Sequence, residues 1–181
     1  VFGLAVFATG LLYVTPPVCL GRRAAGDITL AYGLGMLPVL GAYVVQTGDL
    51  TRTVYVASMP IVVSTGLWVW ALDVESLEVD RAQFRETLAT AFGSERAVRV
   101  VTVALAVLLF ASLFVAVVSS SVSPWALAGV LSLAPVRRVV IGSGARERTT
   151  AWDPAMGRDA FFAHLVVSGA LALSSLPSAL R

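Results

Sequence analysis

Long apolar runs, separated by short polar segments, divide the chain along nearly its whole length. A helix needs about 20 mostly apolar residues to cross a bilayer, and these runs do not alternate polar and apolar residues as a barrel strand does. The candidate spans are residues 1–15, 28–46, 53–72, 97–119, 124–141 and 161–180. The second to fourth runs are clean, whereas the last two are weaker. In the fifth, Pro135, Arg137 and Arg138 fall near its end.

Helices are the structure that these runs predict, because every backbone polar group in lipid must be paired within the protein. Small residues inside the runs, such as Gly33, Gly35 and Gly41, suit close helix packing in a bilayer. The sequence therefore predicts an all-α, polytopic transmembrane helix bundle of about six spans, forming a single domain over residues 1–181. The chain opens with Val1 inside an apolar run, so we expect that an N-terminal part is missing.

The composition agrees with a membrane protein and excludes several kinds of function. The 181 residues are 57% hydrophobic and 13% charged, whereas soluble domains carry about 25% charged residues. All thirteen basic residues are arginines, and the net charge of +2 is too small to indicate a nucleic-acid partner. One cysteine, Cys19, and one histidine, His164, argue against a disulfide, a zinc cluster and a Cys-His nucleophile.

The arginines are distributed unevenly between the two sides of an alternating six-span chain. Eleven of the thirteen fall in or beside the connections on one side, and only Arg52 and Arg181 fall on the other. Short cytoplasmic loops of membrane proteins are enriched in arginine. We therefore expect a multi-pass protein of the cell membrane whose polar segment at residues 73–93 is cytoplasmic.

That polar segment, DVESLEVDRAQFRETLATAFG, holds five acids within fourteen residues. Asp73, Ser76 and Asp80 stand at i, i+3 and i+7, on one face of a helix that continues out of the third span. Mg2+ takes one or two carboxylates, keeps several waters and completes its shell with phosphate oxygens, so this spacing suits a metal-diphosphate site. By spacing alone, however, an ordinary polar loop whose acids pair with neighbouring arginines is the more frequent outcome.

Motifs in residues 13–50 change that balance. Two prolines end the first apolar run, and Gly26 and Asp27 are typical of a turn and an N-cap before the second run. The distinctive residues are Tyr13, Pro16, Pro17, Arg23, Gly26, Asp27, Gly41, Tyr43, Gln46 and Thr47, and downstream Asp80, Arg81, Arg85, Thr87, Leu88, Ala89 and Gly93. In these positions the chain resembles the UbiA-type intramembrane prenyltransferase superfamily, and within it the 1,4-dihydroxy-2-naphthoate polyprenyltransferases of menaquinone synthesis.

The resemblance implies a nine-helix bundle, of which about six spans are present, and transfer of a polyprenyl group from an allylic diphosphate to an aromatic acceptor. It implies Mg2+ as the cofactor, with Asp80 as the best candidate for a metal ligand. We take Asp73 and Glu78 as the next candidate ligands, and Asp80 and Asp73 as the catalytic residues. The residues that would bind the diphosphate are Arg22, Arg23, Arg81, Arg85 and Tyr13. The alternative for the arginines is the positive-inside pattern alone, and for Tyr13 an interfacial anchor.

The chain also departs from the family pattern. It has Ser76 where related sequences have an aspartate four residues before Asp80, Phe84 where they have glycine, and Cys19 where they often have a basic residue. Asp73 stands where they tend to have asparagine, and we hypothesise that it supplies the missing carboxylate. An earlier Asn-Asp-x-x-Asp motif of the family has no match here, so the chain would carry only half of the metal site.

Other functions stay open on the sequence alone. The same fold accepts other acceptors, namely 4-hydroxybenzoate, a glycerol-phosphate lipid or a carotenoid. Ser76 also favours a different class, a polytopic membrane protein without catalysis, such as a binding or transport subunit. Transporters carry paired charges within their spans, whereas the charges here gather at one membrane face, which favours chemistry on a charged head with a buried tail.

Overall fold

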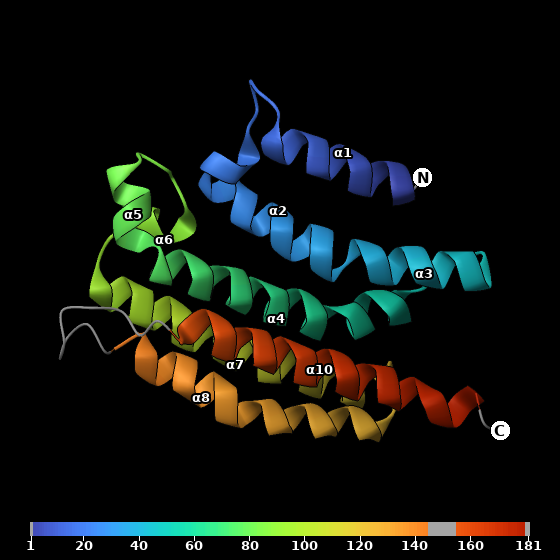
Figure 1. Ribbon diagram of the computed structural model, residues 1–181. Coiled ribbons are helices and arrows are strands. Elements are labelled where there is room, and N and C mark those ends of the chain that lie inside the picture. Colours follow the sequence, from blue (N-terminus) through green and yellow to red (C-terminus); the bar gives the residue numbers. More distant parts are fainter. Residues whose placement is uncertain (1, 145–154, 180–181) are drawn as a thin grey trace.

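The computed structural model describes residues 2–144 and 155–179, and within these ranges the chain is helical, without strands (Figure 1). The longer helices are α1 (Phe2–Val14), α2 (Ala24–Gly35), α3 (Leu37–Thr47), α4 (Arg52–Glu75), α7 (Glu95–Val118), α8 (Leu133–Gly142) and α10 (Met156–Ala179). Short pieces connect them: η1 (Leu20–Arg22), α5 (Leu77–Ala82), α6 (Leu88–Phe92) and η2 (Pro124–Ser132). The predicted all-α class is confirmed.

Five helical segments of the described chain are long and apolar enough to cross a membrane. They are Ala24–Thr47, Arg52–Glu75, Glu95–Val118, Pro124–Gly142 and Met156–Ser174. Five of the six predicted runs therefore correspond to candidate spans. The first run forms only a shorter apolar helix, Gly3–Val14. The predicted end of the sixth run at residue 180 lies outside the described residues.

The second span is interrupted in its middle by Pro38. Proline lacks the amide hydrogen of a helix interior and clashes with the carbonyl four residues earlier. Accordingly α2 ends at Gly35, Met36 separates the two helices, and α3 begins at Leu37 with Pro38 in its first turn. The two pieces still run on in nearly the same direction, as α2 and α3 do in Figure 1.

Helix α4 lies in the centre of the bundle, between α2 on one side and α7 and α10 on the other (Figure 1). Its main core is an apolar cluster with α7 and α10, in which Leu67, Leu109 and Val167 are fully buried. On its other side α2 approaches closely, because a side chain at Gly35 would meet the Val62 backbone at 2.7 Å. The small residue predicted for close helix packing therefore lies at a helix contact.

The arginines of the described residues gather at one end of the bundle. Nine of them lie in η1 or directly after it, in α5, in the α5–α6 loop, in the first two turns of α7 and α10, or in the middle of α8, and these segments share the left-hand end in Figure 1. Arg52 begins α4 at the opposite end. Arg146, Arg148 and Arg181 lie outside the described residues. The arginine-bearing connections that we predicted for one side of the membrane thus lie at the same end of the bundle.

Candidate functional site

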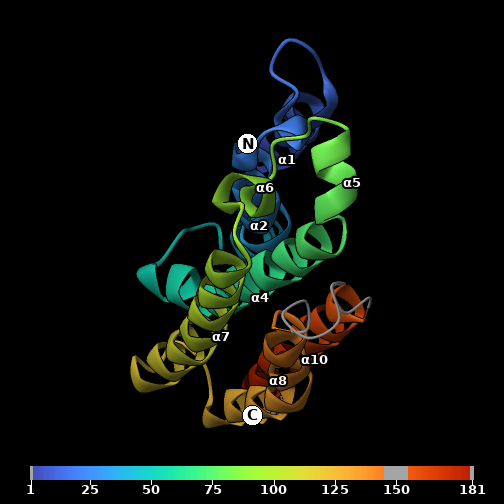
Figure 2. The same ribbon diagram turned by 90° about the vertical axis from the view of Figure 1, so that its left-hand side faces the viewer.

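The acidic segment does not form the continuous helix that its spacing predicts. Helix α4 ends at Glu75, Ser76 leaves helical geometry with φ −89° and ψ 3°, and α5 starts at Leu77. Figure 2 shows α5 turning away from the end of α4. The Ser76 hydroxyl donates to the Leu72 carbonyl at 3.0 Å and to Asp80 Oδ2 at 2.9 Å. Ser76 thus holds the Asp80 carboxylate close to the break.

Asp73 and Asp80 remain on the protected side of this bend. Their exposed fractions are 5% and 3%, so both carboxylates are almost entirely buried. Glu78 lies two residues before Asp80 on α5 and therefore points to another face of the helix. Its side chain is 57% exposed and pairs with Arg81 at 3.3 Å. The structure brings Asp73 and Asp80 together and leaves Glu78 outside.

Arg85 follows α5 and closes the site from the side of the loop. Its Nη1 lies 3.4 Å from Asp80 Oδ1, and its Nε donates to the Gly21 carbonyl at 3.0 Å. One residue on, the Glu86 amide donates to the Arg22 carbonyl at 3.1 Å. The Tyr13 hydroxyl at the end of α1 interacts with Arg85. The α5–α6 loop is therefore anchored on the segment that joins α1 to α2.

The other predicted arginines lie farther out. Arg22 and Arg23 are exposed. Arg81 is occupied by Glu78 and by the Gly93 carbonyl, to which its Nη2 donates. Of the five residues predicted to bind a diphosphate, Tyr13 and Arg85 therefore adjoin the buried carboxylates, and the other three do not.

Asp27 is a member of this cluster that the sequence did not assign. We predicted an N-cap at Asp27, and this prediction is wrong, since Arg23 holds the N-cap position and Asp27 lies in the first turn of α2. Its side chain is buried, and Oδ2 accepts the Leu88 amide of α6 at 2.7 Å. The signal that could have assigned Asp27 to the site is an acidic residue at the start of an apolar run.

The carboxyl groups of Asp27 and Asp73 lie close enough to interact directly, across the contact between α2 and α4. Asp80 and Arg85 lie within electrostatic range of both. One oxygen of Asp73, Oδ2, is buried without a hydrogen-bond partner. Burying an ionised group costs much free energy unless an opposite charge or a donor compensates it. The two buried acids in contact can therefore both be ionised only if a cation is bound between them.

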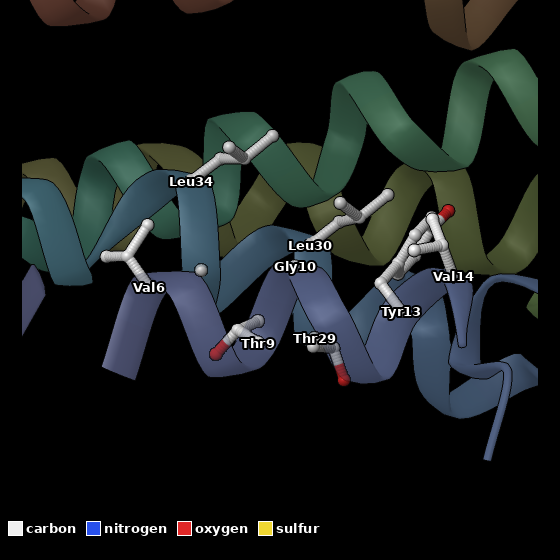
Figure 3. Close-up of a pocket in the computed structure, with 9 residues that line it drawn as sticks. Val6, Thr9, Gly10, Tyr13, Val14, Thr29, Leu30 and Leu34 are labelled. Carbon is white, nitrogen blue, oxygen red and sulfur yellow. The ribbon is translucent and has the colours of Figure 1, made fainter. Parts of the chain in front are cut away.

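An apolar cavity of about 300 Å³ begins beside Tyr13. Figure 3 shows it between α1 and α2, and its lining residues are Val6, Thr9, Gly10, Tyr13, Val14, Thr29, Leu30, Gly33 and Leu34. Tyr13 and Val14 stand at one end of the row of side chains, and Val6 and Leu34 at the other. The cavity thus extends along α1 and α2 from Tyr13, whose hydroxyl is the link to Arg85.

A metal ion can be held by protein side chains alone, or by one or two carboxylates together with water and phosphate oxygens. The carboxylates here fit Mg2+ only in the second way. Among residues 2–144 and 155–179, no group of three or more His, Cys, Asp or Glu side chains is arranged to hold a metal ion by itself. Mg2+ often uses only one or two carboxylates and takes water and phosphate oxygens for the rest of its shell. The unpartnered Oδ2 of Asp73, beside a second carboxylate, fits that pattern.

The long apolar helices and the charged cluster at one end define a multi-pass helical membrane protein. The model of the UbiA prenyltransferase family matches residues 1–173, so the chain belongs to this family. It is also similar to 1,4-dihydroxy-2-naphthoate octaprenyltransferase of Bacillus subtilis (strain 168), with 28% identity over 140 residues. That match covers 76% of this chain and 44% of the relative, so the chain spans less than half of the relative's length. No solved structure matches the chain.

Proposed function

We propose that this protein is a Mg2+-dependent prenyltransferase that moves a polyprenyl group from an allylic diphosphate to an aromatic acceptor. One observation carries the proposal: Tyr13 lines an apolar cavity and also interacts with Arg85, which pairs with the buried Asp80. A polyprenyl diphosphate has the same division, because a highly charged head is joined to a long apolar tail.

The charged head of the substrate would bind at the arginine-bearing end. The guanidinium of Arg85 and the hydroxyl of Tyr13 are donors suited to diphosphate oxygens, and the guanidinium gives planar, charge-assisted hydrogen bonds. Exposed Arg22 and Arg23 would raise the local concentration of an anionic substrate. Arg81 would help in the same way from the outer face of α5.

Asp73 and Asp80 would hold Mg2+, whereas Glu78, the third ligand expected from the sequence, would contribute only if its exposed side chain turned inward. Bound Mg2+ would neutralise the charge that builds up on the departing diphosphate, a contribution of several kcal/mol to the transition state. Arg85, held by Asp80 and Gly21, is positioned to donate to the same departing group. No covalent nucleophile is needed when the electron-rich ring attacks the allylic carbon.

The apolar cavity would hold part of the prenyl tail and keep water away from the reacting carbon. Its lining is aliphatic apart from Tyr13, Thr9 and Thr29, and the Thr9 hydroxyl donates to the Ala5 carbonyl of its own helix. Exclusion of water protects a cation-like allylic carbon from hydrolysis. An apolar cavity beside a charged cluster therefore supports transfer rather than hydrolysis of the prenyl group.

We propose 1,4-dihydroxy-2-naphthoate as the acceptor, and hence a role in quinone synthesis. The support is the motif match together with the similarity to the Bacillus subtilis relative, which is named for this acceptor. At 28% identity, acceptors such as 4-hydroxybenzoate remain the alternative to be tested beside it. We also propose that the arginine-rich end faces the cytoplasm, because short cytoplasmic loops are enriched in arginine.

The decisive test is prenyl transfer by the full-length protein in membranes. Radiolabelled polyprenyl diphosphate is incubated with each acceptor, with Mg2+ or with a chelator, for the wild type and for Asp80→Asn. We expect metal-dependent product that falls at least about hundredfold in Asp80→Asn, since losing about 3 kcal/mol of transition-state stabilisation has this effect. Asp49→Asn, which removes an exposed charge at the opposite end of the bundle, is the matched control.

Absence of product with every acceptor, in a folded protein, would contradict the proposal. It would favour the non-catalytic membrane protein that Ser76 first suggested.

A further inference from the structure

We propose that Asp27 and Asp73 together bind one divalent cation, so that Asp27 of α2 is a metal ligand in its own right. This inference deepens the proposed function and rests on it for the identity of the cation as Mg2+. What it adds is the pairing of Asp27, in the first turn of α2, with Asp73, in the last turn of α4. Neither the spacing of the acidic segment nor its motif contains this pair.

The first observation is the position of Asp73. Its side chain is 95% buried, since only 5% of it is exposed, and its Oδ2 has no hydrogen-bond partner. A buried carboxylate oxygen without a partner costs several kcal/mol unless something is bound there. The free oxygen therefore has room for a partner, and the contact with Asp27 and the balance of charge bear on which partner it is.

The second observation is the contact with Asp27. Two carboxyl groups in direct contact repel each other when both are ionised, so either a proton or a cation must lie between them. Asp27 already uses Oδ2 to accept the Leu88 amide at 2.7 Å, and a carboxylate has further lone pairs for a cation. This hydrogen bond also fixes the orientation of the Asp27 carboxylate.

The third observation is the balance of charge. Three carboxylates, those of Asp27, Asp73 and Asp80, lie within electrostatic range of one guanidinium, Arg85. Fully ionised, these four groups carry a net charge of minus two. One divalent cation neutralises this excess, whereas one proton shared between Asp27 and Asp73 neutralises only half of it.

The coordination that remains is available from outside the protein. Two carboxylates match the number that Mg2+ commonly takes from protein, and water or diphosphate oxygens supply the other positions of an octahedral shell. Asp80, held by Ser76 and Arg85, would reach the same cation through one of its bound waters, so that Asp27 joins the site proposed above and Asp80 keeps its part in it. The site therefore joins α2 and α4 through a metal ion.

Direct metal binding tests the pair without relying on catalysis. The full-length protein is placed in lipid nanodiscs, stripped of metal and titrated with Mn2+, and free Mn2+ is followed by electron paramagnetic resonance, first alone and then with inorganic diphosphate. Asp27→Asn and Asp73→Asn are the test variants, because asparagine keeps the size of the side chain and, at position 27, the acceptor for the Leu88 amide. Asp49→Asn, whose carboxylate likewise accepts a backbone amide at 2.7 Å, is the control.

We expect each test variant to weaken the same Mn2+ site by at least about tenfold, because even outer partners of metal ligands are worth roughly 10–100-fold in affinity. The double variant should bind no more weakly than the weaker single variant, since both residues serve one ion. Asp49→Asn should bind as the wild type does. Circular dichroism and thermal unfolding establish that each variant is folded.

Wild-type Mn2+ binding in folded Asp27→Asn would overturn the inference. So would wild-type binding in both variants together with raised thermal stability, which would indicate a shared proton or plain repulsion instead. Failure of the proposed function has a different signature. Mn2+ binding that depends on both acids, without prenyl transfer to any acceptor, would keep the metal site and reject the prenyltransferase.

Discussion

Asp73 and Glu75 are two acids at the end of the same helix, and their surroundings differ. Glu75 faces α10, where its Oε1 accepts the Gly157 amide at 2.6 Å in the first turn of that helix. Asp73 faces α2, where it meets another carboxylate and keeps one oxygen without a partner. Glu75 satisfies a free amide at a helix N-terminus, as capping groups do. The difference separates an acid that holds the fold together from an acid left available for a ligand.

The largest expected effect lies in catalysis. Asp73→Asn should lower prenyl transfer at least about hundredfold, since it removes a ligand worth several kcal/mol in the transition state. Glu75→Gln should stay within about twofold of wild-type activity while losing about 1 kcal/mol of stability, the difference between a charged and a neutral hydrogen bond. Transfer assays and thermal unfolding of both variants measure this contrast. Full Mg2+-dependent activity in Asp73→Asn would remove the distinction between the two acids.

A smaller effect is expected at Gly35, where α2 packs against the face of α4 that also carries Asp73. Gly35→Ala places a methyl group 2.7 Å from the Val62 Cα, and forcing such contacts costs about 1–3 kcal/mol. Gly169→Ala is the matched control, because its new methyl group meets nothing within 4 Å and alanine is the better helix former. Thermal unfolding in one detergent should therefore shift downward for Gly35→Ala and slightly upward for Gly169→Ala. Equal shifts would mean that the two helices separate without cost.

The smallest expected effect concerns the loop that carries Arg85. Phe84 adopts a positive φ of 54°, and its side chain is 93% exposed. A left-handed conformation costs a residue with a side chain about 1–2 kcal/mol, and glycine avoids most of this cost. Phe84→Gly should thus raise stability by about 1 kcal/mol or less, offset in part by the greater freedom of glycine in the unfolded chain. A marked fall in the unfolding temperature would show that the Phe84 ring has a role in packing.

The spans could be predicted from the sequence because bilayer thickness fixes the length of an apolar helix. Position 84 was another place where a signal could be found in the sequence. The family pattern that the chain resembles has glycine where this chain has Phe84, and the positive φ at this position is the physical reason for glycine. The break at Ser76 could not be predicted, since neither glycine nor proline marks it and the bend depends on where α5 packs.

The contact between Asp27 and Asp73 was equally hidden from the sequence. They are 46 positions apart in the sequence, and their meeting depends on how closely α2 approaches α4. Sequence spacing reports on residues within one helix, whereas this pair is created by packing between two helices. Tyr13 and Arg85 were found only because their motifs could be matched, although their assigned roles stay predictions.

The hydrogen bond from the Leu88 amide to Asp27 links α6 to the first turn of α2. The bond joins residues 61 positions apart, and Leu88 begins α6, whose first turn is held by the reciprocal bonds of Thr87 and Thr90. Helix α6 therefore cannot move independently of the first turn of α2 without breaking a short bond in a buried place. A displacement of the Asp27 carboxylate would therefore also act on α6 and on the loop before it, which carries Arg85.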